Sequence, residues 1–300
     1  MFSSVQTEFV CFPSGTPYSD VSADARCSLN HTASVPVLLI LHGFKAFARW
    51  GFFPYFGEYF ADKGFLTLTV NFSLNGTPHR INADSEECSE PENFARNTIS
   101  QEVRDAETMV RAVVEGKFDA QAPIFAEQLR TRWNGDIFLL AHSRGGASAW
   151  VLGERFKEVK KIAALGTIAR LDRFTDRAKQ EWRKNGFFAV QNARTGQELR
   201  IDAGYLDDIA ENASRLEPLQ TIKRLRQALL LVHGDQDLTV PIAEAETLYA
   251  AAQKAKCNVH WETIPQTAHT FGISHPMTAE QAAKPAFVQT LSLLEKFFYE

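Results

Sequence analysis

The sequence predicts an α/β protein whose mostly parallel central sheet is covered by helices on both faces, with a small inserted cap. Two observations carry this prediction. Short continuous apolar runs, such as Val35–Leu41, are typical of strands that are buried on both faces. Segments with helical spacing of apolar residues, such as 98–115, separate these runs. Strands that alternate with helices require crossover connections, and crossovers make neighbouring strands parallel.

The expected elements follow one another along most of the chain. The apolar runs predict strands at residues 35–41, 65–72, 137–141, 162–168, 228–233 and 259–264. The helical spacing and stop signals predict an aromatic helix that ends at Gly64 and further helices at residues 98–115, 145–156, 243–255 and 286–298. Thr98 and Gln101 have the spacing of a capping box at the start of their helix. The segment around 6–12 adds an antiparallel edge strand.

One interval departs from this alternation of strands and helices. Between the strands at 162–168 and 228–233, a single helix would suffice, yet the chain runs much further, and long excursions of this kind are usually functional. A hairpin is expected around Thr195-Gly196, with helical stretches on either side. We therefore predict a cap at residues 171–226, inserted into a core formed by residues 1–170 and 227–300. The acidic stretch 82–92 is expected to be a solvated loop.

Composition narrows the class of protein. The chain has 300 residues, 45% of them hydrophobic and 23% charged, with a formal net charge of -4, which is typical of a soluble globular protein. No Lys/Arg cluster indicates a nucleic-acid partner, and no apolar run is long enough for a membrane span. No signal-peptide pattern is seen, and the cysteines lack metal or disulfide spacing, so we expect a reduced, cytoplasmic protein. The four cysteines are Cys11, Cys27, Cys88 and Cys257.

The stretch 136–150, DIFLLAHSRGGASAW, leads a buried strand into Ser143 and two glycines. Three interpretations compete: a phosphate-binding turn, an ordinary capping serine, and a nucleophile held at the top of the sheet. Phosphate-loop and dinucleotide-binding motifs are missing, and no histidine or carboxylate spacing suits a metal, so we expect neither a metal nor a cofactor. Other strand ends carry His42-Gly43-Phe44, Asp235 with Asp237, and His269. A serine, an acid and a histidine that meet at one sheet edge can activate a hydroxyl group.

These motifs resemble those of the α/β-hydrolase superfamily. A-H-S-R-G-G resembles the nucleophile elbow, H-G-D-Q-D-L-T-V-P the acid segment and T-A-H-T-F-G the histidine loop, in the family order. The resemblance implies a catalytic triad of Ser143, Asp237 and His269. It also implies an oxyanion hole formed by the backbone N–H groups of Phe44 and Arg144. The stretch HGFKAFARWGFFPYFGEYFADKGF is similar to bacterial cinnamoyl (feruloyl) esterases and dienelactone-hydrolase-like proteins.

Some positions have competitors or depart from the pattern. Asp235 competes with Asp237 for the acid but follows His-Gly directly, where it can brace the turn. His275 competes with His269 but precedes a proline and has the character of a loop residue. Ala141 stands where the elbow usually has its first glycine, which predicts a slightly altered elbow that remains active. The remaining histidines beside the site are expected to support its loops, and they are His42, His142 and His233.

The leading hypothesis is a serine carboxylesterase that hydrolyses short acyl or aromatic acyl esters through an acyl-enzyme. Aromatic side chains that could line its acyl pocket are Phe47, Trp50, Trp182, Phe187 and Tyr205. A peptidase or amidase with the same triad stays open, as does a non-catalytic ligand-binding protein on this fold. The expected partner is a small-molecule ester, with no nucleic acid and no membrane, and a homodimer stays open.

Overall fold

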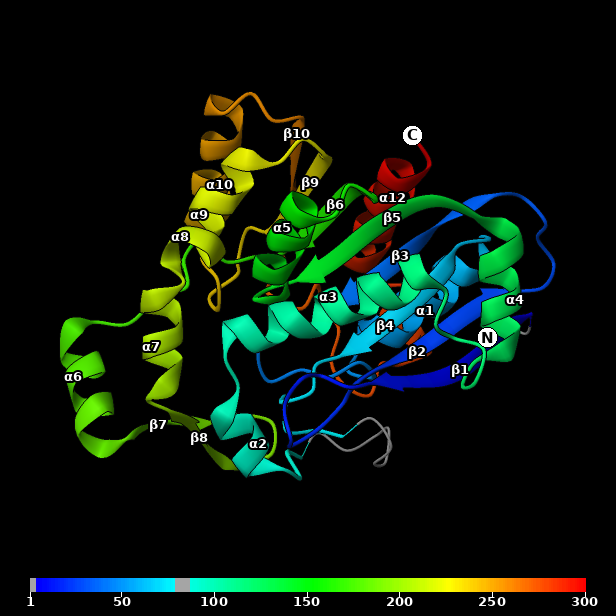
Figure 1. Cartoon of the computed structure of the whole chain (residues 1–300). Coiled ribbons are helices and arrows are strands. Elements are labelled where there is room, and N and C mark those ends of the chain that lie inside the picture. Colours follow the sequence, from blue (N-terminus) through cyan, green and yellow to red (C-terminus); the bar gives the residue numbers. More distant parts are fainter. Residues whose placement is uncertain (1–3, 79–86) are drawn as a thin grey trace.

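A twisted eight-stranded sheet organises the chain in the computed structural model, which describes residues 4–78 and 87–300 (Figure 1). Its strand order is β1-β2-β4-β3-β5-β6-β9-β10. The strands of this sheet are β1 (Val5–Phe12), β2 (Val21–Ser28), β3 (Val35–Leu41), β4 (Leu66–Asn71), β5 (Trp133–His142), β6 (Val159–Leu165), β9 (Ala228–Gly234) and β10 (Val259–Ile264). β1 pairs with β2, and β2 with β4, in antiparallel fashion, whereas all pairs from β4 to β10 are parallel. The sheet is therefore mostly parallel with an antiparallel edge.

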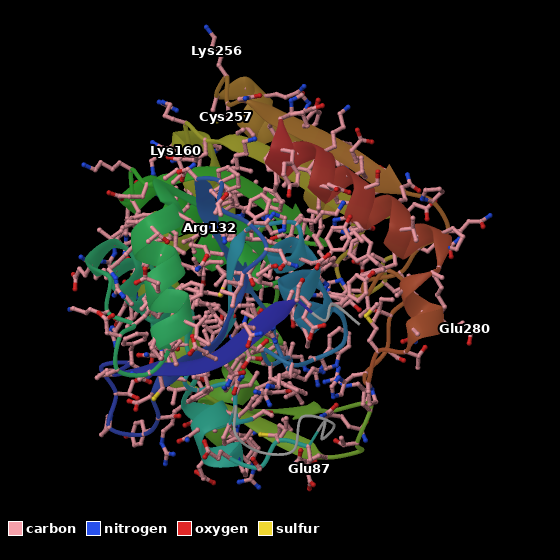
Figure 2. All side chains as sticks on the ribbon, turned by 90° about the vertical axis from the view of Figure 1, so that its right-hand side faces the viewer. Glu87, Arg132, Lys160, Lys256, Cys257 and Glu280 are labelled. Atoms are coloured by element: carbon pink, nitrogen blue, oxygen red, sulfur yellow. The ribbon has the colours of Figure 1, made fainter. Side chains whose placement is uncertain are left out.

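Helices cover both faces of the sheet. The larger helices are α1 (Phe52–Asp62), α3 (Ile99–Glu115), α4 (Pro123–Arg132), α5 (Gly145–Arg155), α10 (Ile242–Lys254) and α12 (Pro285–Tyr299). Side chains of α3, α4, α5 and α10 pack into one hydrophobic cluster, and those of α1 and α12 pack into another. Figure 2, turned by 90°, shows α4 and α12 on opposite sides of the strands. Shorter helices are α2 (Pro91–Arg96) and α11 (Ala279–Ala282).

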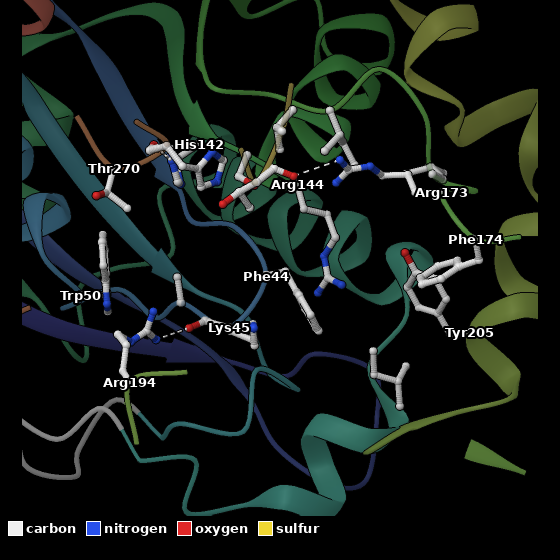
Figure 3. Close-up of a pocket in the computed structure, with 18 residues that line it drawn as sticks. Phe44, Lys45, Trp50, His142, Arg144, Arg173, Phe174, Arg194, Tyr205 and Thr270 are labelled. Carbon is white, nitrogen blue, oxygen red and sulfur yellow. Dashed lines mark hydrogen bonds between the residues drawn. The ribbon is translucent and has the colours of Figure 1, made fainter. Parts of the chain in front are cut away.

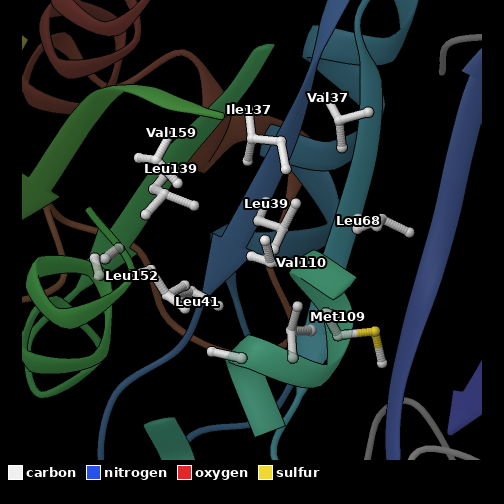
Figure 4. Close-up of a cluster of buried hydrophobic side chains, with 14 of the residues drawn as sticks. Val37, Leu39, Leu41, Leu68, Met109, Val110, Ile137, Leu139, Leu152 and Val159 are labelled. Carbon is white, nitrogen blue, oxygen red and sulfur yellow. The ribbon is translucent and has the colours of Figure 1, made fainter. Parts of the chain in front are cut away.

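Strand β3 shows why the sheet needs two covering layers. Val37, Leu39 and Leu41 point into the first cluster, and Leu38 and Ile40 point into the second. Successive side chains of a strand point to opposite faces, so a continuous apolar run is stable only when both faces are covered. Figure 4 shows the first cluster, in which side chains of α3 and α5 pack on β3, β4, β5 and β6.

The chain between β6 and β9 forms a separate group of elements. It contains helices α6 (Asp176–Asn185), α7 (Gly204–Glu211), α8 (Ala213–Leu216) and α9 (Pro218–Thr221), the 3-10 helix η1 (Ile222–Arg224), and the hairpin β7 (Phe187–Gln191) and β8 (Glu198–Asp202). β7 and β8 pair in antiparallel fashion and leave Thr195 and Gly196 in their turn. α2 packs against β8. In Figure 1, α6, α7 and the β7–β8 hairpin lie beyond the ends of the parallel strands, whereas α8 and α9 pack beside α5. The division into core and cap at 171–226 stays a prediction.

Most element bounds agree with the sequence pattern, with three informative differences. β6 begins and ends three residues earlier than expected, since its apolar signal continues past Leu165 into the loop at Ile168. The Thr98 hydroxyl accepts a hydrogen bond from the Gln101 amide, but the Gln101 side chain binds Ser14 and Asp105, so the capping box is not reciprocal. Of the acidic stretch 82–92, residues 82–86 lie outside the described residues, while 91–92 begin α2. No helix in the described ranges is both long and apolar enough to cross a membrane.

Candidate active site

The candidate site lies where four parallel strands end. Ser143 follows β5, Phe44 follows β3, Asp237 follows β9, and His269 follows β10. Because these strands are parallel, their carboxyl ends meet at one edge of the sheet, which is where open α/β sheets hold their ligands.

Ser143 occupies a strained turn between β5 and α5. Its φ is 54°, a left-handed conformation that is uncommon for residues other than glycine. The Ser143 amide donates to the Leu165 carbonyl at 2.8 Å, and the Thr167 hydroxyl donates to the Ser143 carbonyl at 2.9 Å. These bonds hold the serine at the corner. Strain of this kind is often concentrated at functional sites.

The two glycines after the corner allow α5 to approach the neighbouring strands. A Cβ on Gly145 would lie 2.5 Å from the His42 carbonyl oxygen, and one on Gly146 would lie 1.9 Å from the Thr167 hydroxyl oxygen. Neither position has room for a side chain. Ala141, by contrast, is buried in the first hydrophobic cluster, which accommodates its methyl group.

Asp237 and His269 are in direct contact. His269 Nδ1 lies 2.6 Å from Asp237 Oδ2, and Asp237 Oδ1 accepts hydrogen bonds from the amides of Thr239 and Val240, both at 2.9 Å. Burial alone would raise the pKa of Asp237, but hydrogen bonds from His233 and His269 outweigh it and hold the pKa below its ordinary value. The carboxylate is therefore ionised, and it orients the imidazole with Nδ1 protonated and Nε2 available as a base.

His142 supports this pair from the end of β5. Its Nε2–H donates to the His269 carbonyl oxygen at 3.0 Å, and the two rings lie 4.6 Å apart. Burial and the neighbouring His269 lower the pKa of His142 to about 3, so its ring is neutral. The strand that carries Ser143 thus also fixes the backbone of His269.

The other neighbouring groups also brace loops. His42 Nδ1 donates to the Gly43 carbonyl at 2.9 Å, and His233 Nε2 donates to the Val240 carbonyl at 2.8 Å. Asp235 accepts from the Thr267 amide at 3.3 Å, and His275 Nδ1 accepts from the Gly51 amide at 2.9 Å. Asp235 and His275 therefore make turn contacts, and neither is part of the Asp237–His269 contact.

A cavity of about 550 Å³ opens beside these groups (Figure 3). Ser143, Phe44, Arg144 and His269 line it, whereas Asp237 lies behind His269. Within the described structure the Ser143 hydroxyl makes no hydrogen bond to His269, and such bonds often tighten only when substrate is bound. The amides of Phe44 and Arg144 have no backbone acceptor in the described ranges, as the proposed oxyanion hole requires.

The five aromatic residues predicted for the acyl pocket divide into two groups. Trp50 and Tyr205 line the cavity, but Phe47, Trp182 and Phe187 do not. Trp182 is buried between Phe188 and Tyr205, with ring centroids at 5.0 and 5.8 Å, and so packs inside the group of elements between β6 and β9. Phe47 packs against His275, and the Phe187 ring stacks under the Arg200 guanidinium. These three side chains therefore pack against neighbouring elements, and the wall of the cavity is formed by other residues.

Several lining residues were not predicted from the sequence. Ile168 and Leu171 add apolar surface, and Thr270 follows His269. The charged lining residues missed by the pattern are Lys45, Arg173 and Arg194. Lys45 directly follows Phe44 in the predicted oxyanion segment, a signal that could have pointed to it. No grouping of three metal-ligating side chains occurs in the part of the chain that the structure describes.

Comparison with known proteins agrees with this architecture. Residues 169–292 match the model of Peptidase_S9, the prolyl oligopeptidase family. Est1E from Butyrivibrio proteoclasticus with ferulic acid bound is 18% identical, with a TM-score of 0.60, over 92% of this chain and 96% of that one. A proposed dienelactone hydrolase from Klebsiella pneumoniae is 11% identical, with a TM-score of 0.59, over 99% of both chains.

A peptidase is also similar. The acylaminoacyl peptidase of Pyrococcus horikoshii is 15% identical, with a TM-score of 0.62, over 99% of this chain but 42% of that one. No curated protein matches the sequence. The family match together with the dienelactone hydrolase and peptidase neighbours supports a hydrolase. The predicted fold class is confirmed: the chain has the fold of the α/β-hydrolase superfamily, and its C-terminal part matches the prolyl oligopeptidase family.

Proposed function

We propose that this protein is a serine hydrolase that cleaves carboxylic esters through an acyl-enzyme formed on Ser143. The observation that carries the proposal is the 2.6 Å contact between His269 Nδ1 and Asp237 Oδ2 beside a cavity that Ser143 lines. An imidazole whose Nδ1–H is held by a buried carboxylate is the base that a serine hydroxyl needs.

In the proposed reaction, Ser143 Oγ attacks the ester carbonyl while its proton passes to His269 Nε2. The amides of Phe44 and Arg144 donate to the oxygen that becomes negative. The carbon–oxygen bond to the alcohol then breaks, and the alcohol leaves with the proton from His269. A water molecule gives a proton to His269 and attacks the acyl group, which releases the carboxylic acid and restores the Ser143 hydroxyl.

The cavity supports a small-molecule substrate. Its volume of about 550 Å³ is within the usual range for such sites, and Trp50, Phe174 and Tyr205 give it aromatic walls. Est1E, which shares the fold, holds ferulic acid in its structure. Short acyl esters and an aromatic acyl ester are therefore the substrates to test.

The test compares wild-type protein with Ser143→Ala on p-nitrophenyl butyrate and methyl ferulate. Ser143→Ala should lower kcat by a factor on the order of 10⁶, and it should also lose labelling by a fluorophosphonate. Ser148→Ala is a matched control, because Ser148 is buried on α5 and its hydroxyl has no partner among the described residues. Equal turnover by wild type and Ser143→Ala would refute the proposal.

A peptidase or amidase is the second candidate, favoured by the family match at residues 169–292 and by the acylaminoacyl peptidase neighbour. Ester and amide cleavage use the same acyl-enzyme, and they differ in the leaving group that His269 must protonate. An ester and the anilide of the same acid would distinguish the two candidates. Faster cleavage of the anilide would favour the peptidase.

A further inference from the structure

Among the residues that the structure describes, the charged side chains that line the candidate cavity are cations and not carboxylates. Within the described residues, no Asp or Glu lines it. The four cationic lining residues are Lys45, Arg144, Arg173 and Arg194. A concave site with charges of one sign concentrates ligands of the opposite sign.

Two of these cations are neutralised by acids outside the cavity wall. Arg144 forms an ion pair with Glu102, whose side chain is 2% exposed. Arg173 forms an ion pair with Glu244 at 2.8 Å. The charge of Lys45 has no such partner in the described ranges, because its Nζ donates to the Gln191 carbonyl oxygen at 3.1 Å and makes no ion pair there.

The position of Lys45 is unusual in two respects. Its φ is 58°, a left-handed conformation in a residue that has a Cβ. Its ammonium group also lies 5.7 Å from the ring centroid of Phe44, the residue whose amide is a proposed oxyanion donor. Strained conformations persist where the surrounding structure enforces them, often at ligand sites.

A second cation reaches the same segment from the β7–β8 turn. Arg194 donates from a terminal nitrogen to the Lys45 carbonyl oxygen at 2.8 Å, as Figure 3 shows. Burial, followed by the charge of Arg194, lowers the pKa of Lys45. The charge of Arg194 thus disfavours the ammonium form of Lys45, and an anion bound beside Lys45 would favour that form.

Arg144 adds a further donor. Its guanidinium lies 4.4 Å from the Phe44 ring centroid, and its Nε is buried without a hydrogen-bond partner in the described part of the chain. Buried polar atoms are normally hydrogen-bonded, so this Nε lacks a partner that a water molecule or a ligand group would supply. Lys45 and Arg144 thus converge on the space around Phe44 (Figure 3).

We propose that the natural substrate is an ester that carries a carboxylate, which Lys45 binds with support from Arg194 and Arg144. The cleavage of this ester rests on the proposed function, whereas the binding of its carboxylate does not depend on that function. Lys45 directly follows Phe44, whose amide is the proposed donor to the ester carbonyl. We therefore expect only a few bonds between the substrate's carboxylate and the carbonyl carbon that is attacked. A neutral ester of the same shape leaves the Lys45 ammonium group without an anion in the described ranges.

Binding tests the inference without turnover. Ser143→Ala protein is titrated calorimetrically with monomethyl glutarate and with methyl 5-methylhexanoate, in which an isopropyl group replaces the carboxylate. The anionic ester should bind about tenfold tighter, the factor that a charge-assisted hydrogen bond supplies. Equal or tighter binding of the neutral ester would overturn the inference.

Substitution then tests Lys45 itself in the Ser143→Ala background. Lys45→Met should remove most of the preference for the anionic ester, and Lys45→Arg should retain it, because arginine keeps the charge. Lys184→Gln, which removes an exposed cation from the end of α6, is the matched control and should leave the preference unchanged. A preference that survives Lys45→Met in a folded protein, or one that is lost in Lys45→Arg, would overturn the assignment.

Turnover by wild-type protein separates this inference from the proposed function. Monomethyl glutarate carries its carboxylate on the acyl side, and 4-carboxyphenyl butyrate carries it on the alcohol side. Each is compared with its isopropyl isostere. Preference for one anionic ester identifies the side, and it should weaken as salt is added, because salt screens the attraction. Faster cleavage of both neutral isosteres would refute the carboxylate site and leave the proposed ester cleavage in place. Tighter binding of the anionic ester without any ester cleavage would refute the proposed ester cleavage and leave the carboxylate site in place.

Discussion

Gly166 provides a sharp test of how closely the candidate site is packed. It follows β6 with a φ of +53°, and a Cβ at this position would lie 3.2 Å from His269 Nδ1 and 3.4 Å from Asp237 Oδ2. Gly166→Ala therefore combines two effects. Alanine in a left-handed conformation costs about 1–2 kcal/mol of folding free energy. The new methyl group also presses on the hydrogen bond that orients the imidazole.

Gly116 separates these two effects. It ends α3 with a φ of +66°, and a Cβ there would meet nothing within 4 Å. Gly116→Ala and Gly166→Ala should therefore lose similar free energies of unfolding, about 1–2 kcal/mol each by chemical denaturation. Only Gly166→Ala should also lose activity, since the imidazole must move by a few tenths of an ångström.

Activity and stability are measured on both variants with the same ester. A misplacement of 1 Å can cost about 100-fold in rate, so a smaller shift is expected to lower kcat about tenfold in Gly166→Ala. Gly116→Ala should keep its kcat. If the two variants retain the same kcat, then the packing of Gly166 against His269 and Asp237 has no influence on the reaction, and the reasoning is wrong.

Three further predictions concern buried charges. Asp237→Asn should lower kcat about 10⁴-fold, as measured by steady-state kinetics. The amides of Thr239 and Val240 hold the side-chain oxygen and so turn the new NH₂ group toward His269, which reverses the tautomer of the His269 imidazole. Glu102→Gln should lower the free energy of unfolding by about 3–5 kcal/mol by leaving Arg144 without its buried partner, and denaturation should show a smaller loss when Arg144→Met is added. Burial, which outweighs hydrogen bonds from Ser73 and Gln101, raises the pKa of Asp105 to about 7, so the folded state binds a proton that the unfolded state releases near pH 4. Wild-type stability should thus fall as pH rises from about 4 to 7, and Asp105→Asn should lack this component of the fall; a parallel pH dependence in both proteins would contradict the assignment.

The parallel part of the sheet was predictable because its signal is local. Val35–Leu41 is apolar throughout, and the structure buries both of its faces. β2 carries no such signal, because it contains Asp24 and Arg26 in its interior. Both are buried, and they form an ion pair at 2.8 Å that Arg49 extends. Arg49 and Thr69, which lie far along the chain, complete the contacts of this pair, so the strand cannot be recognised from its own sequence.

The candidate site shows the same limit. The corner at Ser143 is encoded by neighbouring residues, since Gly145 and Gly146 must lack side chains for the turn to form. The wall of the cavity depends on how the elements between β6 and β9 pack against the rest of the chain, and local sequence patterns do not encode this packing. Sequence reasoning therefore selected Trp182 for its size, although it packs internally, and missed Arg194.

The contacts between the hairpin and the segment after β3 have a consequence for the timing of the reaction. Lys45 donates to the Gln191 carbonyl at the end of β7, and Arg194 donates back to the Lys45 carbonyl. The segment that presents the Phe44 amide is thus tied at two points to the hairpin. If the hairpin moves outward to admit a molecule, it must either break both ties or pull that segment along. The reaction would then begin only after the hairpin has returned, so that entry of the substrate and positioning of the Phe44 amide become successive steps of one cycle.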